Sequence, residues 1–527
     1  MSSDRLAGIA EQAARGGLFL FVGTASSTVV LAIGSIMIAR LLGPSGYGLY
    51  ALTLLMPSLL VSLADVGMNY ALIRLPAKLR SEGDYKGSNR AIRLGILLKL
   101  SLSVAAFLIC YFGADLIATT VLNRAELAPF LRLASILIVF QTLLEATSNS
   151  FVGLDFMQYS ASIQILYSIL KSVLAPAFIL IGLGLAGAIA GHLVGIFVAG
   201  LTGAAILFTK HVRSTGDTSG SSSVKIGMLL GYGLPLYLAA ILGAFLPQYQ
   251  SMVLAHFATN VEIGNFNAAW NFNSLLLILM NPIATAMFPM FSKMDTENQR
   301  SDLARAFALA VKYTSLILIP ASIAVMVFSR DLVYVTYGRG YTLAPQYLII
   351  LSALYLLTGL GFSIVGSFLN GVAETRTFLT MSILALAIYL PLGPALVSFG
   401  GPYGLLIAYI LSEAASVLYG VRQASAKFSA RPDLKASGRI LLAALGAAVP
   451  TVGLTRLDPL GTGILDLIIG GMLYLATYMT LAPILKAVDK QDISNLRTIL
   501  CRTRMVARLA NPVLEYEDKL LSFLHEV

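Results

Sequence analysis

The sequence IARLLGPSGYGLYALTLLMPSLLVSLADVGMNYALIRLP, residues 38–76, decides the fold. The Gly-Pro-Ser-Gly turn at 43–46 separates two apolar segments. Each segment is long enough to cross a bilayer, because a hydrocarbon core needs about 20 mostly apolar residues in a helix. Gly and Pro favour a tight reversal between them. We therefore predict a transmembrane hairpin that carries four notable polar residues, Arg40, Asp65, Asn69 and Arg74.

The composition extends this prediction to the whole chain. Of the 527 residues, 57% are hydrophobic and only 12% are charged, whereas soluble domains carry about 25% charged residues. The mean hydropathy is +0.81, and the first apolar run is too long for the core of a cleaved signal peptide. We therefore expect a multi-pass protein of the cell membrane.

Apolar runs predict about fourteen spanning helices. Their expected ranges are 17–39, 47–72, 94–112, 131–153, 160–181, 184–209, 227–255, 263–288, 309–328, 346–370, 378–398, 403–421, 440–455 and 463–486. Most Lys and Arg residues fall in loops on one side of this arrangement, which the positive-inside rule assigns to the cytoplasm. Both termini are therefore expected in the cytoplasm. The net charge of +10 is then a topology signal, and nucleic acid is not an expected partner.

An internal repeat organises these helices. Gly184 and Gly187 recur as Gly401 and Gly404, an offset of 217 residues. YGLY at 47–50 corresponds to IGNF at 263–266, an offset of 216. Because six helices lie between equivalent positions, the repeats should be parallel and related by an axis along the membrane normal. The all-α chain should thus contain two six-helix lobes and two extra C-terminal helices. The expected divisions are an N-lobe at 1–209, a hinge loop at 210–226, a C-lobe at 227–421, a basic loop with helices 13 and 14 at 422–486, and a cytoplasmic tail at 487–527.

The segment ARLLGPSGYGLY at 39–50, with Asp65 and Arg74 after it, resembles one branch of a known superfamily. That branch is the polysaccharide transporters of the multidrug/oligosaccharidyl-lipid/polysaccharide (MOP) exporters, which are similar to Wzx-type flippases. FPMFSK at 288–293 and GVAETR at 371–376 carry the same resemblance, which covers roughly residues 15–425. It implies a MATE-like MOP fold, alternating access and a central cavity formed by helices one, two, seven and eight.

The resemblance implies a flippase that moves a polyprenyl-linked oligosaccharide, such as a polysaccharide, O-antigen or glycan precursor, from the cytoplasmic to the outer leaflet. A MATE-like drug or cation antiporter is an alternative, and a non-transporting scaffold is another. A membrane glycan transferase or polymerase is less favoured, because the outer loops are short and catalytic groups, including histidines at metal-ligand spacing, are missing. No P-loop occurs, so the chain is not expected to hydrolyse ATP itself. We expect no enzyme activity, catalytic residue, metal site or cofactor. Membrane lipid, other glycan-assembly proteins, H⁺ and Na⁺ are the further candidate partners.

Polar residues at membrane depth are the candidate site residues, because ionisable groups there cost several kcal/mol unless paired or hydrated. Arg15, Arg40 and Arg74 are candidates for phosphate binding, since guanidinium groups pair with phosphate oxygens through two hydrogen bonds. Asp65 and Asn69 are candidates for the substrate cavity. The alternative is that Arg15 and Arg74 only mark topology, that the turn at Arg40 needs a solvated charge, and that Asp65 and Asn69 form an interfacial cluster.

Two further groups of polar residues complete the predicted site. Glu145 and Lys171 are expected at similar depths, as an ion-coupling site or as a buried pair that only stabilises the lobe. Asn267, Trp270 and Asn271 share one face of the eighth expected helix. Amides beside an aromatic ring are typical of sugar recognition, and interhelical hydrogen bonding is the alternative.

Overall fold

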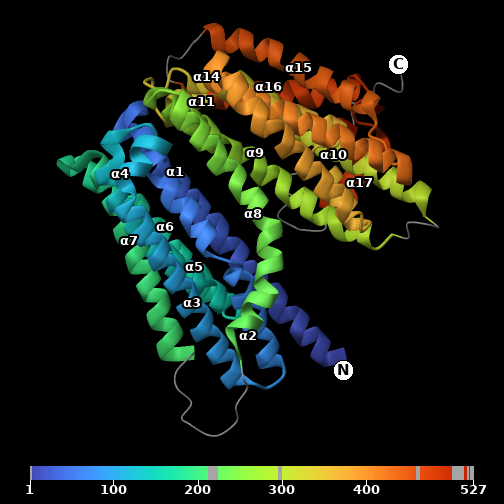
Figure 1. Cartoon of the computed structure of the whole chain (residues 1–527). Helices are drawn as coiled ribbons and strands as arrows, with labels where there is room; N and C mark the ends of the chain where they lie inside the picture. The colour runs from blue at the N-terminus through green and yellow to red at the C-terminus, as the bar shows by residue number, and fades with distance from the viewer. Residues whose placement is uncertain are drawn as a thin grey trace. The chain divides into compact units, whose positions relative to one another are not determined.

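The computed structural model describes residues 3–211, 224–294, 299–457, 463–500, 515–518 and 521–522. Within these ranges the chain is helical and contains no strand (Figure 1), which confirms the predicted all-α class. Eight helices of this described part are long and apolar enough to cross a membrane, or nine if a pair bent by 45° counts as one span. The number fourteen itself stays a prediction.

The helices of the first half pass from α1 to α8. Their bounds are α1 (Ser3–Ala64), α2 (Met68–Ser81), α3 (Tyr85–Phe112), α4 (Ala114–Leu116), η1 (Ile117–Val121), η2 (Ala125–Leu127), α5 (Ala128–Gly153), α6 (Met157–Phe178), η3 (Ile179–Leu183), α7 (Gly184–Ile206), η4 (Leu207–His211) and α8 (Ile226–Phe257). The second half continues with α9 (Asn260–Ser292), α10 (Arg300–Val327), α11 (Ser329–Thr336), α12 (Ala344–Ala353), η5 (Leu354–Leu360), α13 (Val365–Gly371), α14 (Thr375–Phe428), α15 (Leu434–Leu457), α16 (Ile464–Ile484) and α17 (Lys490–Leu500).

Gly43, Gly184 and Gly401 have positive φ and lie in or directly beside the loops that the sequence predicts. Gly43 has φ 68° and ψ 175° and breaks α1 at the predicted turn. Gly184 has φ 50° and ψ −130°, and Gly401, its predicted repeat equivalent, has φ 57° and ψ −147° inside α14. Positive φ angles of this kind are open to glycine and costly for other residues. The two positions that the repeat pairs therefore share an uncommon backbone geometry.

The chain forms two compact units, residues 1–264 and 265–527, so the boundary falls inside α9. The predicted lobes divide the chain earlier, at a hinge whose residues 212–223 lie outside the described ranges. The predicted lobe boundaries stay a prediction.

Small residues let the helices of the first unit approach closely. α1, α5, α6 and α7 pack side by side, with α3 against α5 (Figure 1). A Cβ atom on Gly34 of α1 would lie 2.2 Å from the Ser172 hydroxyl of α6, and one on Gly191 of α7 would lie 2.4 Å from the backbone of Ala175. The Ser172 hydroxyl also donates to the Val30 carbonyl at 2.9 Å. Such contacts are typical of helices that associate in membranes.

In the second unit, α10, α15 and α16 pack around a proline inside α10. Pro320 has no N–H and therefore leaves the Leu316 carbonyl without its usual helical donor. The Tyr478 hydroxyl of α16 donates to that carbonyl at 3.1 Å, and the Tyr474 hydroxyl donates to the Pro320 carbonyl at 2.9 Å. Two buried tyrosines thus join α16 to α10.

Candidate functional site

The site begins at a break between α1 and α2. The predicted helix 47–72 does not continue through residues 65–67, because Val66 has φ 45° and Gly67 has φ 81°. Asp65 accepts hydrogen bonds from the first residues of α2. Its carbonyl accepts the Met68 N–H at 2.8 Å, and its Oδ1 accepts the Asn69 N–H at 3.2 Å. Discontinuous membrane helices commonly frame transporter binding sites, because the freed backbone and polar caps need a hydrated cavity.

Only glycine fits at the centre of this break. A Cβ atom on Gly67 would lie 2.1 Å from the carbonyl oxygen of Gly233 on α8, and one on Gly233 would lie 2.3 Å from the Gly67 oxygen. The backbones of the break and of α8 are therefore in direct contact. This contact holds the loop next to the polar side chains described below.

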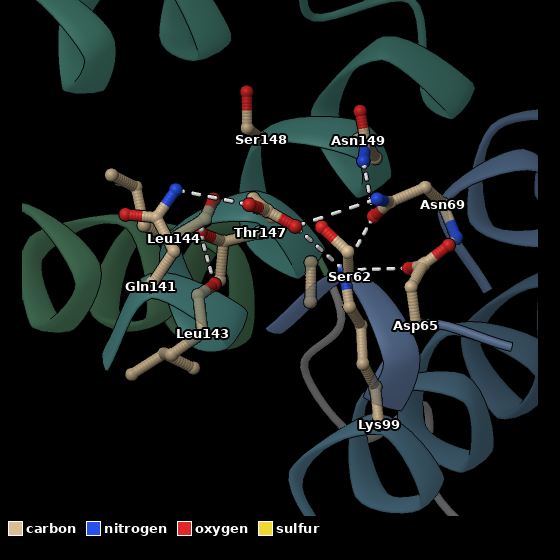
Figure 2. A network of polar contacts seen from close by, with 12 residues as sticks. Ser62, Asp65, Asn69, Lys99, Gln141, Leu143, Leu144, Thr147, Ser148 and Asn149 are labelled. Carbon is tan, nitrogen blue, oxygen red and sulfur yellow. Dashed lines mark hydrogen bonds and ion pairs between the residues drawn. The ribbon is translucent and has the colours of Figure 1, made fainter. Parts of the chain in front are cut away.

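A buried lysine joins the break to two neighbouring helices. Lys99 of α3 is fully buried, and its ammonium lies 2.9 Å from Asp65 Oδ1 and 3.1 Å from Glu145 Oε2. It also donates to Asn69 Oδ1 at 2.5 Å. Figure 2 shows Asp65, Asn69 and Lys99 turned toward one another. The four groups come from the break, α2, α3 and α5. A lysine at this depth requires such partners, because an unpaired buried charge is very costly.

One face of α5 completes the polar cluster. Gln141, Glu145 and Asn149 are four residues apart in turn, so they share a helical face. Gln141 Nε2 donates to Glu145 Oε1 at 2.9 Å, and Asn149 Nδ2 donates to Asn69 Oδ1 at 2.7 Å (Figure 2). We call Asp65, Asn69, Lys99, Gln141, Glu145 and Asn149 the polar cluster.

An open cavity of about 260 Å³ borders the polar cluster. It is lined by Val61, Ser62, Asp65, Asn69, Tyr70, Glu145, Tyr237 and Ile241. Carboxylate, amide and hydroxyl groups thus face the same space as two tyrosine rings, a combination that can bind sugar hydroxyls and the apolar face of a sugar ring. The polar cluster has one amine and two carboxyl groups, so it is unsuited to a phosphate.

The structure gives Glu145 a different partner from the predicted one. Glu145 pairs with Lys99, whereas the Lys171 ammonium lies 5.9 Å from the ring centroid of Tyr167. The Tyr167 hydroxyl is 2.9 Å from His192 Nε2, and the Tyr50 hydroxyl is 3.4 Å from His192 Nδ1. The predicted pair of Glu145 and Lys171 is thus replaced by two separate groups, because α3 inserts its own lysine beside Glu145.

Two of the predicted phosphate-binding arginines, Arg40 and Arg74, are not among the residues that line the cavity. The Arg74 guanidinium stacks on Tyr232 at 4.4 Å from the ring centroid, and the side chains of Arg74 and Arg40 are exposed. The side chain of Arg15 lies outside the part of the structure that is described.

The predicted sugar-binding residues of the second unit belong to a network of aromatic rings. Trp270 stacks on Phe266 at 5.8 Å and contacts Tyr409 at the same centroid distance. Asn271 Nδ2 donates to the Tyr337 hydroxyl at 3.0 Å. Asn267 is partly buried on the same helix. Packing accounts for the Trp270 contacts, so its role in binding stays a prediction.

Lys99, Gln141 and Asn149 are cluster members that the predicted site lacks. The four-residue spacing of Gln141, Glu145 and Asn149 was a usable signal, because it places three polar groups on one helical face. Lys99 was visible as a charge inside an apolar run. No spacing rule links it to Asp65 or Glu145. Across the described ranges, no three His, Cys, Asp or Glu side chains gather as a metal site would require.

The second unit contains a separate, apolar cavity of about 730 Å³ between α10 and α16. Glu517, in the short helical turn at 515–518, is one of its lining residues and is 8% exposed. Burial and, to a lesser extent, the nearby charge of Asp492 raise the pKa of the Glu517 carboxyl to about 7.

We expect the 515–518 turn to be held less firmly as the pH rises from about 4.5 to about 7. Over this range the undocked carboxyl, with its usual pKa of 4.5, loses its proton first, so ionisation favours release. Above about 7 the effect should level off. Limited proteolysis of the C-terminal segment measures it, with wild type and Glu517→Gln compared at each pH. Identical pH profiles in the two proteins would contradict this prediction.

Comparisons with known proteins agree with these features. A family profile described as polysaccharide biosynthesis protein (Polysacc_synt) matches residues 13–295. The probable low-salt glycan biosynthesis flippase Agl15 of Haloferax volcanii is 21% identical over 488 residues, which cover 92% of this chain and 98% of the relative. The lipid II flippase MurJ of Bacillus subtilis is 22% identical over 446 residues, covering 77% and 81%.

Solved structures show the same fold. A lipid II flippase MurJ in an inward closed conformation aligns with a TM-score of 0.71 at 16% identity, covering 89% of this chain and 98% of that one. An inward-facing multidrug resistance MATE family transporter of the MOP superfamily aligns with a TM-score of 0.63 at 19% identity, covering 78% and 98%. The predicted MOP fold is confirmed.

Proposed function

The chain belongs to the polysaccharide biosynthesis family, and from this premise we propose that it is a flippase for a polyprenyl-linked oligosaccharide. It moves the saccharide head from the cytoplasmic to the outer leaflet while the prenyl chain stays in lipid. The observation that carries the proposal is the cavity at the α1–α2 break. Its carboxylate, amide and tyrosine groups suit a hydroxyl-rich head group inside an apolar helical protein.

We take the transport cycle to be alternating access between the predicted lobes, residues 1–209 and 227–421, around the hinge at 210–226. The scheme keeps the predicted orientation, in which both termini and the tail from residue 487 are cytoplasmic. It also keeps the predicted basic loop and helices 13 and 14 at 422–486. Membrane lipid, glycan-assembly proteins and H⁺ or Na⁺ are the further partners it admits. The relatives Agl15 and MurJ are named a probable glycan biosynthesis flippase and a lipid II flippase, which supports a transporter. That the chain is not an enzyme is part of this proposal.

A test in cells follows from this proposal. Deletion of the gene should cause the lipid-linked oligosaccharide to accumulate on the cytoplasmic leaflet, where external glycan-modifying enzymes cannot reach it. Restoring the wild-type gene is the control. Unchanged sidedness of the lipid-linked pool would contradict the proposed function.

A MATE-like drug or cation antiporter is the second candidate. The likeness to a MATE transporter and the two carboxyl groups beside the cavity favour it, since carboxylates attract cationic drugs. A gene deletion that raises sensitivity to cationic dyes and leaves the lipid-linked pool unchanged would support this antiporter.

Arg74→Ala is expected to reduce flipping about tenfold or more, the loss that corresponds to about 1.4 kcal/mol of binding energy. Arg74 is exposed over Tyr232 and can offer a phosphate two hydrogen bonds. Arg74→Lys should restore only part of the rate, because an ammonium is a point charge. Arg90→Ala is a matched control, since Arg90 is an exposed cation in the same basic region. Full activity of Arg74→Lys would contradict phosphate binding by the guanidinium and would leave Arg74 only the role of a positive charge that sets topology.

The proposed orientation predicts which surface positions react from outside the cell. In a variant without native cysteines, Glu126→Cys should react with a membrane-impermeant maleimide, because 113–130 is a predicted outer loop. Ser81→Cys should react only after the membrane is opened, because basic residues around it mark the cytoplasmic side. Both side chains are exposed, so burial does not confuse the comparison. The reverse pattern would contradict the orientation.

A further inference from the structure

The ammonium of Lys99 has a complete set of oxygen partners. Its three N–H groups face Asp65 Oδ1 at 2.9 Å, Glu145 Oε2 at 3.1 Å and Asn69 Oδ1 at 2.5 Å. These oxygens come from the α1–α2 break, α5 and α2. The Lys99 side chain is 0% exposed, so the protein supplies all of its partners.

Carboxylate and amide oxygens that converge in this way are also the ligands that hard cations take in proteins. The amine is therefore placed where a monovalent cation would otherwise be needed. Without a positive charge there, Asp65 and Glu145 would be two carboxylates at membrane depth with no counter-ion, which is very costly. Lys99 prevents this cost without any ion from solution.

We infer that the Lys99 ammonium is a built-in counter-ion that fills a monovalent-cation site formed by Asp65, Asn69 and Glu145. In the intact protein this site takes no cation from solution. Removal of the amine opens the site to Na⁺ or to a small ammonium ion. This inference goes beyond the proposed function, because it concerns the ion requirement of the first unit and holds for any transported molecule.

The neighbouring cavity provides a route for such an ion. Asp65, Asn69 and Glu145 all line the 260 Å³ cavity, and the Glu145 side chain is 26% exposed. An ion of the size of Na⁺ or methylammonium can therefore reach the oxygens that Lys99 would leave. The same opening explains why the site needs a permanent occupant to exclude other cations.

Lys171 offers a matched control within the same unit. Its ammonium lies over the ring of Tyr167, at 5.9 Å from the centroid. Removal of this amine leaves an aromatic face where Lys99 would leave three converging oxygens. Lys171→Ala should therefore create no selective cation site.

The test is thermal unfolding of the purified full chain at constant ionic strength, with choline chloride exchanged for NaCl, ammonium chloride or methylammonium chloride. Wild type and Lys171→Ala should show the same Tm in every salt. Lys99→Ala should have a lower Tm in choline chloride and should regain several degrees, saturably, with Na⁺ or the small ammonium ions. In Lys99→Ala/Asp65→Asn, at least tenfold more cation should be needed, and with Glu145→Gln added the response should vanish.

Two results would overturn the inference. One is a saturable rise of the wild-type Tm with Na⁺ that Asp65→Asn removes, because the site would then take a cation while Lys99 is present. The other is a folded Lys99→Ala protein whose Tm is the same in all four salts. If Lys99→Ala does not fold, Lys99→Ala/Asp65→Asn carries the test, since it leaves one unpaired carboxylate. If the Tm of this double variant is the same with and without the added cation, the inference is contradicted.

Discussion

Gly48→Ala is expected to abolish transport and to lower the free energy of unfolding by about 1–3 kcal/mol, the usual cost of overpacking. A Cβ atom on Gly48 would lie 2.0 Å from the Asn260 carbonyl oxygen, and one on Gly264 would lie 1.8 Å from the Pro44 oxygen. The contact between α1 and the start of α9 is thus reciprocal. Backbone carbonyls cannot rotate aside as side chains do, so the two helices must separate.

A second set of contacts holds the start of α9 in this position. Arg124 Nε donates to Asn260 Oδ1 at 2.8 Å, and Arg124 Nη2 donates to the Ala258 carbonyl at 2.7 Å. In the proposed alternating-access cycle such close contacts form and open, so we expect a methyl group that keeps the helices apart to stop transport even where the protein still folds.

Gly231→Ala is the matched control for Gly48→Ala. Gly231 lies in the helix α8, and a Cβ atom there would have no other atom within 4 Å. This variant should keep wild-type transport and stability. Flipping rates in proteoliposomes, normalised to folded protein, measure transport by both variants. Wild-type rates in Gly48→Ala would show that the close contact is not needed for transport.

Lys99→Met is expected to lower the free energy of unfolding by about 3–5 kcal/mol in a medium without Na⁺. The loss is large because it leaves the buried Asp65 carboxylate and the partly buried Glu145 carboxylate without their shared partner. The variant Lys99→Met/Asp65→Asn/Glu145→Gln should recover most of this stability, since no uncompensated charge remains. Chemical unfolding of the purified variants in one detergent measures the differences.

The predicted pair of Glu145 and Lys171 supplies the control for this set of variants. Glu145→Gln and Lys171→Met should act additively, within about 0.3–0.5 kcal/mol, because the two residues belong to separate groups. If the losses of unfolding free energy in the single variants of Lys99, Asp65 and Glu145 simply add up in the triple variant, the polar cluster would be contradicted. A strong coupling of Glu145 with Lys171 would contradict the separation of the two groups.

The sequence predicted the helical class and several breaks because those depend on local chemistry. The turn at Gly43 follows from Gly and Pro between two apolar runs, and the repeat correctly singled out Gly184 and Gly401 as special positions. The break at Gly67 was missed. Apolar residues continue on both sides of it, and glycine is common inside membrane helices.

The partner of Glu145 could not be predicted for a different reason. Sequence spacing places a residue at a depth in the membrane and on a face of its own helix. It does not give the rotation of one helix relative to another. Lys99 and Lys171 were both lysines inside expected spans, and only the packing of α3 against α5 brings Lys99 to the carboxylate. The polar residues were therefore found more readily than their pairing.

The most direct test of the central claim is a flipping assay with the purified protein. Proteoliposomes receive a fluorescent polyprenyl-linked oligosaccharide, and a membrane-impermeant quencher reports how much label is accessible on the outer leaflet over time. We expect label to become accessible faster than in protein-free vesicles, with Gly48→Ala at the background rate and Gly231→Ala at the wild-type rate. A wild-type rate equal to that of protein-free vesicles, with folded protein in the membrane, would contradict the assignment as a flippase.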